Sequence, residues 1–289
     1  MEENKLKFAF MTCVQLGLSC IEEIYESGGK LDLIITIPDD HAPNKSGRIY
    51  LDEFSKQHNV PLLKTKQCND AKVIDLIKSE GIDWLFIIGW SQIAKEALLA
   101  APRLGAIGMH PTLLPQGRGR AAIPWAIIKG LNKTGVTMFK LDTGVDTGPI
   151  ISQEEIPIDC LTETATSLYK KVNRAHRTLI AKTWPKLVSG KVELRPQDDL
   201  SASYWEGRKP KDGEINASMT SKQIDTLVRA TTKPYPGAFL SIDEGTKQMR
   251  IWSGRPVEKD ELEISEADPA IIRTKDGHYH CEQFEILPI

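Results

Sequence analysis

The sequence predicts an α/β protein with a doubly wound, Rossmann-like, mainly parallel sheet and a smaller C-terminal β-rich, OB-like domain. Three observations predict it. Apolar runs typical of buried strands alternate with segments of helical periodicity, two hairpin patterns follow a single helix near the end of the chain, and a polar segment separates the two regions. With 289 residues, 40% of them hydrophobic, the chain is long enough to bury one large core and one small one.

The first part of the chain contains five strand-like runs with helix-like segments between them. The strands are expected where apolar residues follow one another, at residues 6–12, 31–39, 61–65, 82–90 and 106–110. Helices are expected where apolar residues recur at helical spacing, at residues 16–29, 50–60 and 71–81. Alternation at this pace is typical of parallel strands joined by crossover helices.

The second part begins with a helix and a strand pair and ends in a β-rich region. The helix is expected at 121–130, the strands at 134–142 and 148–158, and a long amphipathic helix at 162–190. A segment rich in Pro, Asp and Ser follows, in which we place the boundary between a domain of residues 1–200 and one of 201–289. Beyond it we expect a helix with a Ser/Thr N-cap and two hairpins, at residues 220–231, 239–253 and 270–287.

The composition limits the kinds of partner. A net charge of −2 provides no overall attraction to a polyanion, so a nucleic-acid partner would need a local basic patch. Five scattered cysteines without CxxC spacing predict neither a disulfide framework nor a metal site. The N-terminal sequence lacks a signal-peptide pattern, and no apolar run approaches ~20 residues. We therefore expect a cytoplasmic protein without a membrane partner; the oligomeric state is not indicated.

The loop after the first strand contains a single glycine, so the G-x-G-x-x-G fingerprint of dinucleotide-binding folds is absent. In a doubly wound sheet the ligand crevice still lies at the carboxyl ends of the strands. The segments 12–17, 88–93 and 108–120 are therefore expected to line it.

A histidine and two arginines lie on a proline-bounded loop after the fifth strand. An isolated histidine such as His110 is more often a loop residue hydrogen-bonded to a carbonyl than a catalytic group. Arg118 and Arg120 are equally well explained as charged side chains of a solvent-exposed loop. Pro111 and Pro115, however, fix the φ angles of the loop, which makes it a rigid support for these groups. The arginines offer forked donors to phosphate or carboxylate.

Two aspartates follow in the segment KLDTGVDTGPI. Asp-Thr-Gly is common in ordinary turns, but Asp142 or Asp146 could meet His110 at the strand ends. A carboxylate beside an imidazole keeps it protonated or holds its tautomer, which provides a general acid–base pair or an oxyanion stabiliser.

The segment IGMHPTLLPQGRGRAAIPWAIIKGLNKTGVTMFKLDTGVDTGPII resembles the signature region of the folate-dependent formyltransferases. HPTLLPQGRGRAA resembles their His-x-x-Leu-Leu-Pro-x-x-Arg-Gly loop, and LDTGVDTG their Asp-x-Gly-x-Asp-x-Gly segment. IIGWSQI resembles the loop that lines the pterin pocket, and LVRATTKPYPGAF the start of the second domain of methionyl-tRNA and sugar formyltransferases. The similarity extends from about residue 6 to about residue 255.

The resemblance implies transfer of a formyl group from N10-formyltetrahydrofolate to an amine, without a metal, and catalytic roles for His110 and Asp146. It implies that the strand-end loops bind the folate through Ile88, Gly89, Trp90, Gln92, Asp142, Thr143, Gly144 and Val145. The candidate substrate-binding residues are Thr12, Gln15, Pro115, Arg118 and Arg120.

The chain departs from the family pattern at one position. Gly108 occupies the place of the catalytic Asn, whose side chain helps to hold the formyl oxygen. Loss of one such donor costs about 3 kcal/mol of transition-state stabilisation. A backbone N–H, an ordered water or Gln92 could replace it.

Two acceptors fit the resemblance, a nucleotide-linked amino sugar and initiator Met-tRNA. The one compact basic run, GRKPK, is more typical of a solvated linker, which weakens the case for tRNA. We therefore favour a small-molecule nucleotide sugar, such as a UDP-linked 4-amino-4,6-dideoxy sugar for surface glycans. A third alternative is a non-catalytic folate- or nucleotide-binding relative.

Overall fold

The computed structural model describes residues 5–42, 47–216, 218–257, 268 and 270–288. They form two compact units. The first comprises Met1–Gly119, Gly135–Ile156 and Lys171–Tyr204, and the second Arg120–Thr134, Pro157–Lys170 and Trp205–Ile289. The division between residues 200 and 201 stays a prediction.

The large sheet has the order β3-β2-β1-β4-β5-β7-β8. Its strands are β1 (Phe8–Met11), β2 (Leu33–Thr36), β3 (Leu62–Lys64), β4 (Trp84–Ile87), β5 (Gly105–His110), β7 (Lys133–Lys140) and β8 (Ile150–Pro157). The first five pair in parallel, and β7 pairs antiparallel with β5. The prediction of a doubly wound, mainly parallel sheet is confirmed.

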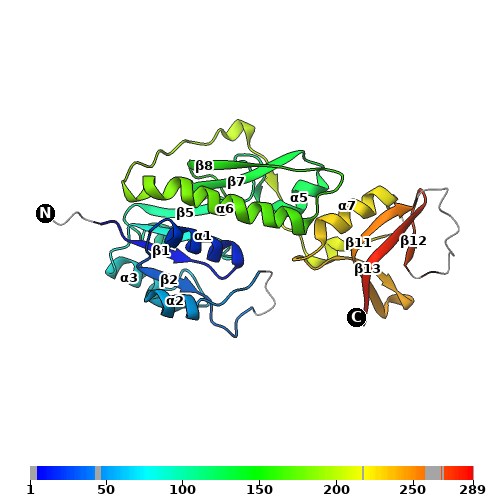
Figure 1. Cartoon of the computed structure of the whole chain (residues 1–289), viewed down its shortest axis with the longest axis horizontal. Helices are drawn as coiled ribbons and strands as arrows, with labels where there is room; N and C mark the ends of the chain where they lie inside the picture. The colour runs from blue at the N-terminus through cyan, green and yellow to red at the C-terminus, as the bar shows by residue number, and fades with distance from the viewer. Residues whose placement is uncertain (1–4, 43–46, 217, 258–267, 269, 289) are drawn as a thin grey trace. The chain divides into compact units, whose positions relative to one another are not determined.

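Helices follow the strands of this sheet (Figure 1), and all but the short helix Glu96–Leu99 were predicted. They are α1 (Gln15–Glu26), α2 (Asp52–His58), α3 (Ala71–Ser79), α4 (Glu96–Leu99), α5 (Ala122–Ile128) and α6 (Ala165–Val188). α6 lies beside α1, where Arg177 forms ion pairs of 2.6 and 2.9 Å with Glu26 and Glu23. The strands β1, β2 and β4 are buried almost throughout because their side chains are apolar on both faces.

A short ribbon was not expected from the sequence. β6 (Arg118–Gly119) pairs with β9 (Tyr204–Trp205), so the proline-bounded loop is hydrogen-bonded to a segment more than 80 residues further along the chain. Short 3₁₀ turns lie at Asp199–Ser201, Pro210–Gly213 and Asp243–Gly245.

The small sheet confirms the β-rich C-terminal region. Its order is β10-β11-β13-β12, built from the strands β10 (Ala238–Ile242), β11 (Lys247–Val257), β12 (Ile271–Arg273) and β13 (His278–Pro288). Helix α7 (Ser221–Thr231) begins at Thr220, whose hydroxyl accepts a hydrogen bond from the Gln223 N–H as the predicted N-cap. Ile224, Val228 and the buried side of the sheet form the core of this unit.

Candidate active site

A cavity of about 320 Å³ lies at the carboxyl ends of β4 and β5. This is the edge at which a doubly wound sheet binds its ligands. Its walls come from the loops after these strands, from the end of β7 and from the loop 142–146. The lining residues are Ile87, Gly89, Trp90, Gln92, Ile93, Ala94, Leu99, Gly108, Met109, His110, Gly119, Phe139, Leu141, Asp142, Gly144, Val145 and Asp146.

His110 and Asp146 meet in this cavity. His110 Nδ1 lies 3.5 Å from Asp146 Oδ2, and the two side chains are 10% and 19% exposed. His110 Nε2 lies 2.8 Å from the carbonyl oxygen of Gly117, which can only accept a hydrogen bond. Both ring nitrogens therefore face acceptor oxygens. The 3.5 Å separation of Nδ1 and Oδ2 is at the long limit of a hydrogen bond.

Asp146 is held in an uncommon backbone conformation. Its φ of +55° lies in the left-handed region, and its Oδ2 accepts a hydrogen bond of 2.8 Å from the Gly119 N–H. Gln197 Nε2 donates to the carbonyl oxygens of Asp146 at 2.8 Å and Gly148 at 2.7 Å. We infer that Gln197 fixes the turn that aims the Asp146 carboxylate at His110.

Arg118, a candidate substrate-binding residue, lies outside this cavity and forms hydrogen bonds within the protein. Its side chain is 2% exposed and does not line the cavity. Its Nη2 donates to Gln197 Oε1 at 2.9 Å and to Asp199 Oδ1 at 2.7 Å, and its Nη1 donates to Tyr204 Oη at 2.9 Å. The guanidinium therefore fixes the position of the Gln197 side chain, whose own hydrogen bonds stabilise the turn at Asp146.

The space beside Gly108 is filled by Leu141. A Cβ atom built on Gly108 would lie 2.7 Å from Leu141 Cδ2 and 3.4 Å from Phe139 Cε1. An asparagine at position 108 would thus require Leu141 to move. Gln92 is a weak substitute for the missing amide, since its Oε1 accepts from the Cys68 N–H and its Nε2 donates to the Lys66 carbonyl.

The structure brings most of the predicted folate-binding residues to the cavity, but not all of them. Gly89, Trp90, Gln92, Asp142, Gly144 and Val145 line it. Ile88 is buried elsewhere and Thr143 is not among the lining residues. The Asp142 carboxylate accepts hydrogen bonds from the Gly144 N–H and the Thr147 hydroxyl, so it also shapes the turn.

The remaining candidate substrate-binding residues lie outside this cavity. Thr12 is fully buried, and its hydroxyl accepts a long hydrogen bond from the Val14 N–H. Gln15 donates to the Ser19 hydroxyl within α1, and the Pro115 carbonyl accepts from the Ser203 N–H. Arg120 belongs to the second unit.

Sequence reasoning missed part of the apolar wall. Phe139 and Leu141 reach the cavity from one face of β7 and its end, and Gly108 pairs with Phe139 in the register of β5 and β7. The alternation of residues 139 and 141 along the strand was the available signal. Ile93 and Val145 line the same cavity and are 78% and 53% exposed.

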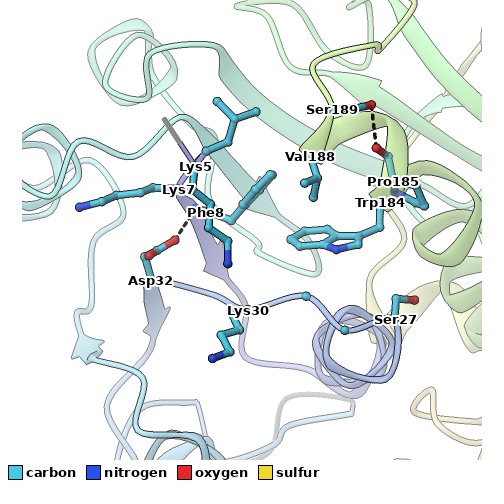
Figure 2. A pocket seen from close by; sticks show the side chains of 13 residues that line it. Lys5, Lys7, Phe8, Ser27, Lys30, Asp32, Trp184, Pro185, Val188 and Ser189 are labelled. Carbon is cyan, nitrogen blue, oxygen red and sulfur yellow. Dashed lines mark hydrogen bonds between the residues drawn. The ribbon is translucent and has the colours of Figure 1, made fainter. Parts of the chain in front are cut away.

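A larger cavity, of about 700 Å³, lies at the opposite end of β1 (Figure 2). Phe8 begins this strand and packs on Trp184 with ring centroids 4.5 Å apart. Lys5, Lys7 and Lys30 also line the cavity, but the Lys7 ammonium donates to the Glu80 carbonyl. None of the predicted site residues is near it, so the smaller cavity is the candidate active site.

Two features are absent from the part of the chain that the structure describes. Residues 5–42, 47–216, 218–257, 268 and 270–288 contain no group of three or more His, Cys, Asp or Glu side chains arranged to hold a metal ion. Within the same ranges, none of the helices combines the length and the apolar character needed to cross a membrane.

The sheet order and the strand-end cavity that contains the largely buried His110–Asp146 pair fit one class of protein, and sequence comparison shows which. The chain belongs to the formyl transferase family. The model of the formyl transferase domain matches residues 19–183, and the model of the formyl transferase C-terminal domain matches residues 208–283.

Individual relatives are similar over most of the chain. The bifunctional polymyxin resistance protein ArnA of Wigglesworthia glossinidia brevipalpis is 35% identical over 249 residues, which are 86% of this chain and 37% of ArnA. This chain therefore spans little more than a third of that relative. WlaRD, described as a sugar 3N-formyl transferase in the presence of dTDP and 5-N-formyl-THF, has a TM-score of 0.71 at 20% identity, covering 97% of this chain and 98% of WlaRD.

Methionyl-tRNA formyltransferase from Clostridium thermocellum has a TM-score of 0.62 at 18% identity, covering 98% of this chain and all of that one (100%). At such identities both structural matches show a shared fold. They do not decide between the two acceptors.

Proposed function

We propose that this chain transfers a formyl group from N10-formyltetrahydrofolate to the amino group of a nucleotide-linked amino sugar. The largely buried His110–Asp146 pair, open to a strand-end cavity in a member of this family, is the observation that carries the proposal. Trp90, Leu99 and Phe139 give the cavity an apolar wall suited to a flat pterin, and the turn at 142–146 offers polar backbone groups.

The reaction forms one bond and breaks another. The neutral amine attacks the formyl carbon, a C–N bond forms, and the bond between the formyl carbon and N10 breaks as the amine proton is passed to N10. Protonated His110 stabilises the oxyanion of the tetrahedral intermediate. Asp146 orients the imidazole and helps to pass the proton.

The choice of acceptor rests on charge and on the relatives. The net charge of −2 favours a small nucleotide over a polynucleotide. WlaRD, the structural match with the higher TM-score of the two, is described as a sugar 3N-formyl transferase. A UDP-linked 4-amino-4,6-dideoxy sugar used for surface glycans is the acceptor that we propose.

The test is incubation of the purified chain with N10-formyltetrahydrofolate and a panel of UDP- and dTDP-linked amino sugars, with formylatable Met-tRNA in parallel. We expect a mass increase of one formyl group in at least one nucleotide sugar. Formylation of the tRNA alone would establish the other acceptor. Folate binding without transfer to any acceptor would favour a binding module and refute the catalytic proposal.

A further inference from the structure

A third cavity, of about 240 Å³, lies within the second unit, and cationic side chains line it. Its walls come from the residues around the start of α5, from the turn before β10 and from the segment 208–213. Three of its lining side chains are cationic: Arg120, Arg208 and Lys209. No carboxylate is found among the described residues that line it.

Arg120 is exposed, but a backbone hydrogen bond and the neighbouring Gly207 restrict its position. Its backbone N–H donates to the Trp205 carbonyl at 3.1 Å. Its side chain lies along Gly207, where an added Cβ atom would be 3.4 Å from Arg120 Cδ and 3.5 Å from Nη1. Across the described parts of the chain, no carboxylate forms an ion pair with Arg120. The guanidinium is therefore free to bind an external anion.

Arg208 is half-buried and stacked on an aromatic ring. Its guanidinium carbon lies 5.2 Å from the centroid of the Trp125 ring, and Trp125 is anchored by a 2.8 Å hydrogen bond from its Nε1 to the Glu206 carbonyl. Arg208 Nη2 donates to the Asp212 carbonyl at 2.6 Å. Burial lowers the pKa of the Arg208 guanidinium. A stacked, partly desolvated guanidinium is a strong partner for a phosphate oxygen.

Lys209 is the third cation of the cavity. Its backbone N–H donates to Asp212 Oδ2 at 2.5 Å, so the Asp212 carboxylate closes the turn at 209–212. Asp212 is not a lining residue, and the cavity itself keeps three positive side chains. A group with two or three negative charges complements this set.

We propose that this cavity binds the diphosphate group of a nucleotide, as a site of the second unit separate from the cavity at His110 and Asp146 in the first. About 240 Å³ is less than the usual volume of a drug-sized ligand site, so the cavity suits an anionic group more than a whole nucleotide. The base and the sugar would extend beyond it. A polynucleotide would need an extended basic track in place of one concave site.

The test is calorimetric titration of the full chain with UDP, inorganic pyrophosphate, uridine and Met-tRNA. The exposed cations are removed by Arg120→Gln and Lys209→Gln. The matched control is Lys211→Gln, which removes a neighbouring lysine of the same basic run that does not line the cavity. We expect each cavity variant to weaken UDP and pyrophosphate binding about tenfold or more, and the control to change it less than twofold. The binding of wild type should also weaken with salt more steeply than that of the variants.

Several outcomes would overturn the site. They are unchanged UDP affinity in both cavity variants, uridine binding as tightly as UDP, or binding of tRNA without binding of UDP. Thermal unfolding checks that the variants fold, and Arg208→Lys, which keeps a charge over Trp125, should retain most of the affinity. Pyrophosphate binding needs no formyl transfer, so its loss in Lys209→Gln would support the site even if no nucleotide sugar is formylated. In that case only the proposed function fails.

Discussion

Replacing Gly108 tests how the chain has filled the space of the absent asparagine. In Gly108→Ala, the new Cβ lies 2.7 Å from Leu141 Cδ2, about 1 Å inside the optimum separation of carbon atoms. Overpacking of this kind costs about 1–3 kcal/mol of unfolding free energy. Leu141→Ala removes the obstructing atom, and because Leu141 is only half-buried, this change alone should cost about 1 kcal/mol.

Together the two changes should cost less than the sum of their separate effects. We expect a favourable coupling energy of about 1–2 kcal/mol in a double-mutant cycle measured by urea unfolding. Gly277→Ala, where an added Cβ meets nothing within 4 Å, is the control and should change stability by at most about 0.5 kcal/mol. Additivity within about 0.5 kcal/mol would show that Leu141 does not occupy the space beside Gly108.

Three further predictions concern the groups around the site. Gln197→Leu leaves the carbonyl oxygens of Asp146 and Gly148 without their donor, so the unfolding free energy measured in urea should fall by about 2–4 kcal/mol. We also expect kcat to fall by a larger factor than the KM of the acceptor changes. Gln197→Glu still accepts from Arg118 but cannot donate to these carbonyls, so an equal loss of activity in it would show that the donated hydrogen bonds matter. Arg118→Met removes the donor of Gln197 Oε1, while the exposed Asp199 carboxylate remains in solvent, so it should cost about 1–2 kcal/mol of unfolding free energy. UDP affinity should stay within about twofold, and a large loss of UDP affinity in the folded variant would show that Arg118 takes part in binding. Burial lowers the pKa of His176 from 6.5 to about 4, so below pH 6.5 the unfolded chain binds a proton that the folded chain does not. The unfolding free energy should therefore fall by up to about 3 kcal/mol as the pH drops from 6.5 to 4. His176→Leu should flatten this part of the pH profile of the unfolding free energy.

The fold was predictable because its signals are local. The apolar runs of β1, β2 and β4 and the periodicity of α1 and α3 each occupy a single stretch of sequence. The N-cap at Thr220 was equally readable. The β6–β9 ribbon was not, because two residues in each strand carry no periodicity and the pairing spans more than 80 residues.

The proximity of His110 and Asp146 could be expected from the sequence because contiguous motifs contain both residues. His110 ends a strand and Asp146 lies in a glycine-rich turn, and the structure brings them together. The hydrogen bonds of the Arg118 side chain could not be predicted, because its partners Gln197, Asp199 and Tyr204 lie 79–86 residues away in the sequence. The part played by Leu141 beside Gly108 depends on the register of β5 and β7, which the sequence does not specify.

The most direct test of the central claim is the single-turnover rate of formyl transfer in His110→Ala and Asp146→Asn, compared with wild type. The variants should bind N10-formyltetrahydrofolate with affinity close to that of wild type, because the apolar wall formed by Trp90, Leu99 and Phe139 is left intact. Each should transfer the formyl group at least about 10²-fold more slowly, as expected when a charge-stabilising or proton-transferring group is lost. A near-normal rate in either folded variant would contradict the assignment of His110 and Asp146 as the catalytic pair.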